Sequence, residues 1–194
     1  NSNMDIILAD LEIDGKTVKA MMQAPKNGFF YVHDRENRKL LSAETYAEIN
    51  WATHVDMETG RPVERPGARY EDGEERISPT PVGAHSWHSM SYNPMTGLAY
   101  FPTVNISAVY NDEGIDPDSW QSAIFEGDTI AVGWRIVEDR THVAGSLQAR
   151  DPVTNTVAWE IPMHGLGNAG TMTTAGNLVF QGRVDGTLRA YNAT

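Results

Sequence analysis

The chain has 194 residues, of which 40% are hydrophobic and 9% aromatic, so it is long enough to bury a sizeable core and should be globular. Its 26 acidic residues outnumber 15 Lys and Arg, and the net charge of -11 disfavours nucleic acid and anionic lipid surfaces as partners. The sequence has no cysteine, no apolar run of about 18 residues and no signal-peptide pattern, which excludes disulfides, thiolate zinc sites and an obvious membrane span.

In chain order, the sequence consists mainly of strand-sized apolar segments bounded by Gly, Pro, Asn or Asp. Only Ser42–Thr53 and Asp116–Phe125 are candidates for short helices, and neither has a convincing amphipathic stripe, whereas Glu58–Pro81 is expected to be a long irregular excursion. The predicted strands are Phe29–Val32, Leu98–Phe101, Gly145–Ala149, Thr156–Trp159, Asn177–Gln181 and Thr187–Tyr191.

A turn signature of Asp or Asn, two residues, then Thr or Asn recurs at Asp34–Asn37, Asn93–Gly97 and Asp151–Asn155. A hairpin with Asp185-Gly186 at its turn follows, and then the start of another copy. Hairpins repeated in this way predict an all-β fold, a partial β-propeller of about three or four blades. Because the last motif is incomplete, we expect residues 1–194 to be one propeller domain truncated at both ends. A self-contained β-sandwich is the alternative.

One segment, Gly83–Pro102, combines two histidines, a tryptophan, a turn and a strand. His85 and His88 suggest a metal site, but no third ligand lies nearby, so structural histidines are favoured. The acidic cluster of Asp72, Glu74 and Glu75 lies in the proline-rich excursion and indicates a solvated loop with no EF-hand spacing.

The sequence contains no convincing motif of another enzyme class. The glycine pattern in Gly165–Gly170 matches a dinucleotide-binding fingerprint, but a predicted strand and not a helix follows it. Phosphate-binding, nucleophile-elbow and zinc-protease motifs are absent from the sequence. The sequence therefore gives no support to a hydrolase or a kinase.

Four segments in chain order resemble the pyrroloquinoline quinone (PQQ) dependent alcohol dehydrogenases, the quinoprotein and quinohaemoprotein ethanol dehydrogenase family. Asp151–Trp159 looks like the tryptophan-docking motif that locks the blades of this propeller of about eight blades. Met21–Arg35 is similar to the segment with the cofactor-facing lysine, Gly83–Pro102 to a quinone-pocket segment, and Gly170–Gly182 to a late blade that closes over the quinone.

The resemblance implies that Lys26, Ser86, Trp87 and Met172 bind the cofactor. Lys26 matches the basic residue that hydrogen-bonds the reactive quinone oxygens, where a fixed cation stabilises developing negative charge. Trp87 offers a flat apolar surface to a planar ligand. Ser86 stands where the family usually has asparagine and reaches less far. The alternatives are an exposed turn lysine and a core tryptophan.

The resemblance also implies a reaction: a primary alcohol is oxidised to an aldehyde by hydride transfer to PQQ, with Ca²⁺ as Lewis acid and an aspartate as base. That aspartate and the Ca²⁺ ligands are expected before residue 1, so no residue here is assigned as catalytic or metal-binding. Asp5 and Asp10 do not fit the motif. The isolated chain is therefore expected to bind PQQ weakly and to be inactive.

The implied partners are a small alcohol and a cytochrome c or another electron acceptor, in the periplasm, with no nucleic acid. A haem c in the full-length protein is compatible with the family. Because a fold does not establish chemistry, a non-catalytic propeller that acts as a scaffold or assembly module is the alternative. Lys26 and Trp87 favour the enzyme, and Ser86 favours the scaffold.

Overall fold

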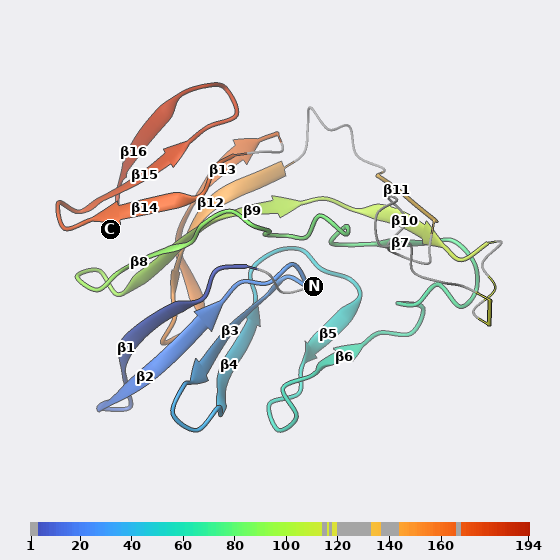
Figure 1. The fold of residues 1–194 in the computed structure, drawn as a ribbon, viewed down its shortest axis with the longest axis horizontal. Coiled ribbons are helices and arrows are strands. Elements are labelled where there is room, and N and C mark those ends of the chain that lie inside the picture. Colours follow the sequence, from blue (N-terminus) through green and yellow to red (C-terminus); the bar gives the residue numbers. More distant parts are fainter. Residues whose placement is uncertain (1–3, 114–115, 117, 120–132, 137–143, 166–167) are drawn as a thin grey trace.

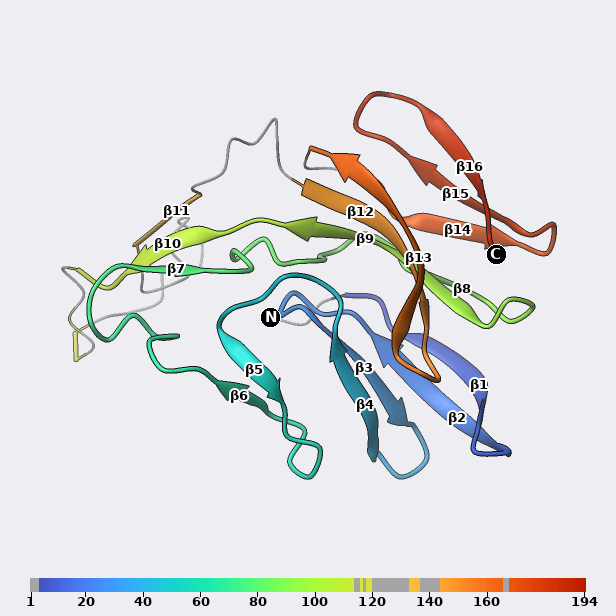
Figure 2. The same ribbon diagram turned by 180° about the vertical axis from the view of Figure 1, so that it is seen from behind.

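The computed structural model describes residues 4–113, 116, 118, 119, 133–136, 144–165 and 168–194. Three sheets of three or four strands fan out on one side of the molecule (Figure 1), and the view from behind shows the same order (Figure 2). The residues in these ranges form strands and turns but no helix, and accordingly contain no helix that could cross a membrane.

The first sheet is an antiparallel meander in which each strand pairs with the next. A two-residue turn with positive φ at Asp14 and Gly15 joins its first two strands, as the twist of a hairpin requires. The strands are β1 (Ile7–Ile13), β2 (Lys16–Gln23), β3 (Phe29–Asp34) and β4 (Leu40–Thr45).

The second sheet has the order β13-β12-β9-β8 and lies between the other two large sheets (Figure 1). Its strand β9 is buried at five successive residues from Ala99 to Thr103, because neighbouring sheets cover both of its faces. The strands are β8 (Ser91–Asn93), β9 (Leu98–Asn105), β12 (Ala144–Asp151) and β13 (Thr156–His164).

The third sheet has the order β14-β15-β16, and its last hairpin has the predicted turn. Gly186 has a φ of 82°, and the Asp185 carboxylate accepts a hydrogen bond of 3.0 Å from the Thr187 amide. The strands are β14 (Thr171–Thr174), β15 (Leu178–Gly182) and β16 (Leu188–Asn192).

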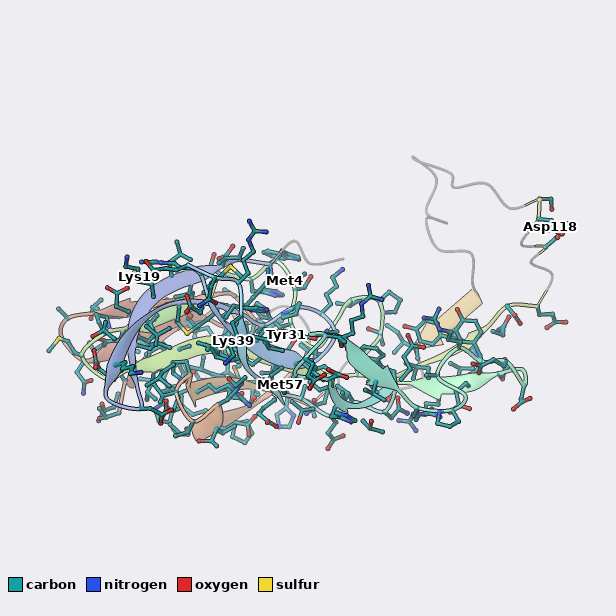
Figure 3. All side chains as sticks on the ribbon, turned by 90° about the horizontal axis from the view of Figure 1, so that it is seen from below. Met4, Lys19, Tyr31, Lys39, Met57 and Asp118 are labelled. Carbon is teal, nitrogen blue, oxygen red and sulfur yellow. The ribbon has the colours of Figure 1, made fainter. Side chains whose placement is uncertain are left out.

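Two smaller sheets extend the molecule beyond the fan. The hairpin of β5 (Ala52–Val55) and β6 (Pro62–Glu64) packs against the first sheet, and the predicted excursion also contains β7 (Glu75–Ile77). That strand pairs with β10 (Ala108–Asn111), which pairs with β11 (Gly133–Ile136). Seen from below, Asp118 lies at the far end of this extension, well away from the three large sheets (Figure 3).

The first and second sheets share a core of aromatic rings. Phe30 on β3 stacks on Phe101 of β9 with ring centroids 5.5 Å apart, and Tyr46 meets Phe101 edge to face at 5.4 Å. Such pairs contribute about 1 kcal/mol beyond the burial of their area. The apolar contact between the two sheets therefore runs through Phe101.

A buried guanidinium ties the same two sheets together. Arg150 on β12 is only 2% exposed, and its Nη2 donates to the carbonyl of Thr45 at 3.1 Å. Its Nε and Nη2 donate to the side chain and the carbonyl of Asn155, and the Asn155 amide donates to the carbonyl of Phe30 at 3.0 Å. Burial lowers the pKa of Arg150 to about 10, so the group stays charged at pH 7.

The second and third sheets meet at Ala193. Trp159 on β13 donates from its indole nitrogen to the carbonyl of Ala193 at 3.3 Å, and the Tyr100 hydroxyl donates to the same oxygen at 2.8 Å. The Thr171 hydroxyl donates to the carbonyl of Tyr100 at 2.8 Å. Trp159 thus joins one sheet to the next, in keeping with the tryptophan-docking resemblance.

This fan of sheets confirms the predicted partial β-propeller and differs from the two facing layers of a β-sandwich. All the predicted strands are present. The predicted helix at Ser42–Thr53 is wrong: the segment ends β4, turns and begins β5, because Ala43 and Tyr46 are buried by packing that overrides helix propensity. Most of Asp116–Phe125 lies outside the described residues. The domain boundaries stay a prediction.

We predict that Arg150→Lys lowers the free energy of unfolding by about 3 kcal/mol, because an ammonium cannot reach the same set of acceptors and leaves buried carbonyls without donors. Urea unfolding followed by circular dichroism measures this. Arg189→Lys is the control, since the Arg189 side chain is 49% exposed and contacts the carboxylate of Asp185 and the hydroxyl of Thr187 at the surface. Equal losses in the two variants would contradict the role given to Arg150.

Candidate functional site

Residues 83–89, which we call the junction loop, touch all three large sheets. The Ala84 amide donates to the carbonyl of Lys26 in the β2–β3 turn at 3.0 Å, and the Val104 amide of β9 donates to the carbonyl of Ala84 at 2.7 Å. At the other end of the loop, the Thr171 amide of β14 donates to the carbonyl of Ser89 at 2.8 Å. The loop is therefore fixed where the sheets converge.

His85 is the buried centre of the junction loop. Its ring is 2% exposed, with Nδ1 2.8 Å from the carbonyl oxygen of Ala24 and Nε2 2.9 Å from that of His88. Burial lowers its pKa to about 4, against the opposing effect of the two carbonyls, so the ring is neutral at pH 7. Both nitrogens face the backbone, which gives His85 the structural role that the sequence favoured.

Trp87 presents its indole to the outside of the junction loop. The side chain is 71% exposed and stacks on the His88 ring, with centroids 4.3 Å apart and 22° between the planes. Burial lowers the pKa of the half-buried His88, so a neutral ring supports the indole. An exposed tryptophan held flat in this way offers one face to a planar ligand.

A hollow of about 470 Å³ lies beside this indole. Met172, itself 57% exposed, comes from β14 and shares the hollow with Trp87, so the fold brings these two predicted cofactor contacts together. The remaining lining comes from the junction loop and from the third sheet: His88, Ser89, Ala169, Gly170, Thr171, Phe180, Gln181, Gly182 and Leu188.

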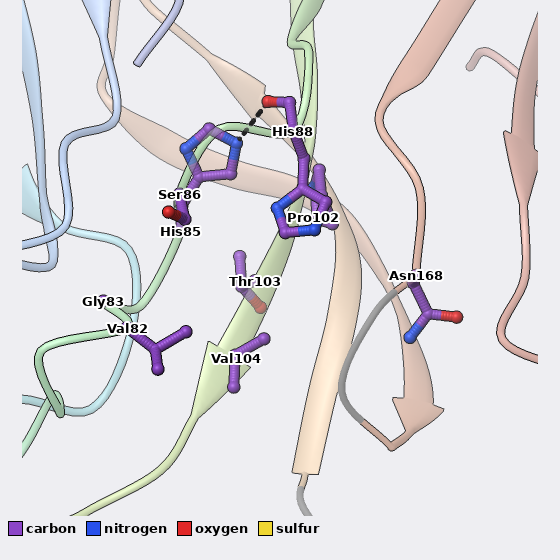
Figure 4. Close-up of a pocket in the computed structure, with 9 residues that line it drawn as sticks. All are labelled: Val82, Gly83, His85, Ser86, His88, Pro102, Thr103, Val104 and Asn168. Carbon is purple, nitrogen blue, oxygen red and sulfur yellow. Dashed lines mark hydrogen bonds between the residues drawn. The ribbon is translucent and has the colours of Figure 1, made fainter. Parts of the chain in front are cut away.

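A second, much smaller pocket of about 20 Å³, room for about one water molecule, lies on the other side of His88 (Figure 4). Ser86 lines this pocket and not the large hollow. The side chain is 7% exposed, and its hydroxyl makes no hydrogen bond to any residue that the structure describes. The other lining residues are Val82, Gly83, His85, His88, Pro102, Thr103, Val104 and Asn168.

Lys26 lines neither space but lies next to the small pocket. A side chain at Gly83 would place its Cβ 2.4 Å from Lys26 Cγ, so the lysine stem runs directly along the glycine backbone. Its ammonium forms no hydrogen bond or ion pair with any of the described residues. Among the described residues, this cation beside the junction loop thus has no partner.

The structure therefore divides the predicted cofactor contacts. Trp87 and Met172 share the large hollow, whereas Ser86 and Lys26 lie at the small pocket behind His88. Their roles toward a cofactor stay predictions. No motif points to Gln181, which lines the hollow and whose side-chain oxygen is buried without a partner among the described residues.

Metal ligands do not gather in the part of the chain that the structure describes: it contains no group of three His, Asp or Glu side chains suited to a metal ion. In the acidic cluster, Glu75 pairs with Arg65 at 2.5 Å and Glu74 with Arg135 at 3.4 Å. Strand β14 follows the glycine pattern of Gly165–Gly170, which agrees with the rejection of a dinucleotide site.

The fan of antiparallel sheets joined by a docked tryptophan defines a segment of a β-propeller. In sequence, the chain is similar to the quinohaemoprotein alcohol dehydrogenase ADH IIB of Pseudomonas putida, with 48% identity over 99% of this chain and 27% of that protein. It is 41% identical to a 1-butanol dehydrogenase (cytochrome c) of Thauera butanivorans over 99% of this chain and 28% of that protein. No protein-family model matches the chain.

Solved structures agree with these relatives. The quinohaemoprotein alcohol dehydrogenase ADHIIG of Pseudomonas putida gives a TM-score of 0.88 at 40% identity, over 98% of this chain and 29% of that chain. The quinohaemoprotein alcohol dehydrogenase of Comamonas testosteroni gives a TM-score of 0.85 at 39% identity, over 99% of this chain and 29% of that chain. The chain spans less than a third of the length of these proteins. It is homologous, from end to end, to a segment of the quinoprotein and quinohaemoprotein alcohol dehydrogenases, which confirms the predicted family.

We predict that Gly170→Ala lowers the free energy of unfolding by about 2 kcal/mol, because the new Cβ would lie 2.5 Å from the Ser89 amide nitrogen and force the junction loop away from β14. Urea unfolding measures the loss. Gly176→Ala is the matched control: its Cβ would find its nearest neighbour, Thr174 Oγ1, at 3.7 Å. A Gly170→Ala variant as stable as the control would show that the contact is not tight.

Proposed function

We propose that this chain is a segment of a quinoprotein alcohol dehydrogenase and forms one wall of its PQQ pocket. The whole enzyme oxidises a primary alcohol to an aldehyde, with Ca²⁺ assistance, and passes the electrons to a cytochrome c or another acceptor in the periplasm. The observation that carries the proposal is the exposed Trp87 indole, which is stacked on His88 and faces the same hollow as Met172.

The residues present fit a flat, anionic quinone. The hollow of about 470 Å³ is large enough for a tricyclic ring, and Trp87 and Met172 give it apolar surfaces. On the β2–β3 turn, Lys26 supplies a cation that has no partner within the described part of the chain. When bound, PQQ would supply the two-electron acceptor that no amino-acid side chain provides.

In this proposal each residue has a distinct task. Trp87 and Met172 would hold the plane of a bound quinone ring, and the Lys26 ammonium would supply a positive charge that stabilises negative charge on its oxygens. The proton of the alcohol goes to an aspartate supplied by another part of the enzyme, and the Ca²⁺ ligands are placed there as well. The proposal of a quinone cofactor and a cytochrome acceptor is supported by the similarity to a quinohaemoprotein alcohol dehydrogenase and to a 1-butanol dehydrogenase (cytochrome c).

A scaffold without a cofactor is the second candidate function. Ser86 favours it, because its short side chain is buried at the small pocket and does not reach the large hollow. Docking through Trp159 would serve a scaffold and an enzyme equally well. The two candidates differ in what they require of Lys26 and Trp87, since a scaffold needs neither an unpaired cation nor an exposed indole beside a hollow.

The test uses a hybrid in which this chain replaces the matching segment of Pseudomonas putida ADH IIB. We expect the hybrid to bind PQQ and oxidise alcohols in a dye-linked assay. Lys26→Ala should lower kcat about 100-fold through loss of charge stabilisation. Trp87→Ala should weaken PQQ binding about tenfold through loss of stacking and apolar contact.

Lys39→Ala is the matched control, because Lys39 lies exposed in the β3–β4 turn, away from the junction loop. Its activity should equal that of the unaltered hybrid. A hybrid that folds and binds no PQQ would favour the scaffold. Alcohol oxidation that is unchanged by Lys26→Ala would show that the role given to the lysine is wrong.

A further inference from the structure

We infer that His85 is a positioning residue that fixes the Lys26 turn relative to the Trp87 indole, and thereby sets the geometry of the quinone pocket. The inference rests on the proposed function. The imidazole spans the two segments directly: Nδ1 lies 2.8 Å from the carbonyl of Ala24, and Nε2 lies 2.9 Å from the carbonyl of His88. Ala24 is two residues before Lys26, and His88 directly follows Trp87.

The ring cannot shift without moving its surroundings. It is 2% exposed and meets Phe101 edge to face at 5.7 Å, and Phe101 is in turn stacked on Phe30 at 5.5 Å. Interiors are close-packed, so a side chain enclosed in this way transmits its position to its neighbours. The core between the first and second sheets therefore sets where the imidazole stands. The imidazole in turn spaces the two segments, because it donates to one carbonyl and packs closely against the other.

The residues next to His85 also contact Lys26, so the position of the lysine depends on the same packing. The Ala84 amide donates to the Lys26 carbonyl at 3.0 Å, and the bare backbone of Gly83 lies against the Lys26 stem. At the other end, His88 supports the Trp87 indole by stacking at 4.3 Å. A displacement of the His85 ring would thus change the direction of the ammonium relative to the indole, although His85 itself touches neither group's tip.

The variants for the test differ from histidine in whether they can donate a hydrogen bond to the two carbonyls. A neutral imidazole has a single N–H, so it donates to one of the two carbonyls at a time. Phenylalanine keeps a ring of similar size and donates to neither carbonyl. Glutamine carries two hydrogens on its amide nitrogen and restores a donor, which makes His85→Gln the conservative variant.

The experiment is a double-mutant cycle in the hybrid enzyme, with the PQQ dissociation constant as the measurement. We expect His85→Phe to weaken PQQ binding about tenfold or more when Lys26 is present, because a displacement of about an ångström removes most of a positioned interaction. With Lys26→Ala already in place, His85→Phe should add little further loss. His85→Gln should restore most of the affinity.

His33→Phe is the matched control, since His33 is a half-buried histidine on β3 that stacks on Tyr31, outside the junction loop. It should leave PQQ affinity unchanged. If His85→Phe does not fold, His85→Leu takes its place in the cycle, because leucine also donates to neither carbonyl. The inference is overturned if the variant without a donor lowers stability and leaves PQQ affinity intact, or weakens affinity equally with and without Lys26. An unaltered hybrid that binds no PQQ overturns the proposed function as well.

Discussion

The structure depends first on one buried cation, the guanidinium of Arg150. A charge removed from water is stable only when every donor finds an acceptor, and here the acceptors belong to two different sheets. The hydrogen bonds of Arg150 therefore hold the β12–β13 turn against the end of β4. Asn155 extends this link to the carbonyl of Phe30. These contacts hold the first two sheets together, and the junction loop is bonded to both of them, through the Lys26 carbonyl and the Val104 amide.

The hollow beside Trp87 is a consequence of this packing and not of a local motif. Its walls come from the junction loop and from the third sheet, segments 80 or more residues apart in the chain. The junction loop carries Trp87, and its backbone is bonded to the β2–β3 turn, to β9 and to β14. The contacts between the sheets therefore stabilise the fold and also fix the positions of the residues that line the hollow.

Much of the fold could be predicted because strand ends carry their own signals, as Asp185-Gly186 does for the last hairpin. The error at Ser42–Thr53 arose because helix-forming residues there are buried by a neighbouring sheet, which local sequence does not reveal. The family resemblance identified Trp87 and Met172 as candidates. It did not predict that Ser86 would line a different pocket from these two residues. That separation depends on His88, which stands between the two spaces and whose position is set by His85.

A crystal structure of the hybrid enzyme with PQQ bound would test the proposed pocket most sharply. We expect the quinone ring to lie against the Trp87 indole and near the Met172 thioether, with the Lys26 ammonium within hydrogen-bonding distance of a quinone oxygen. A ring bound elsewhere, or bound in the hollow with the ammonium turned away from it, would show that this segment does not supply the proposed wall of the quinone pocket.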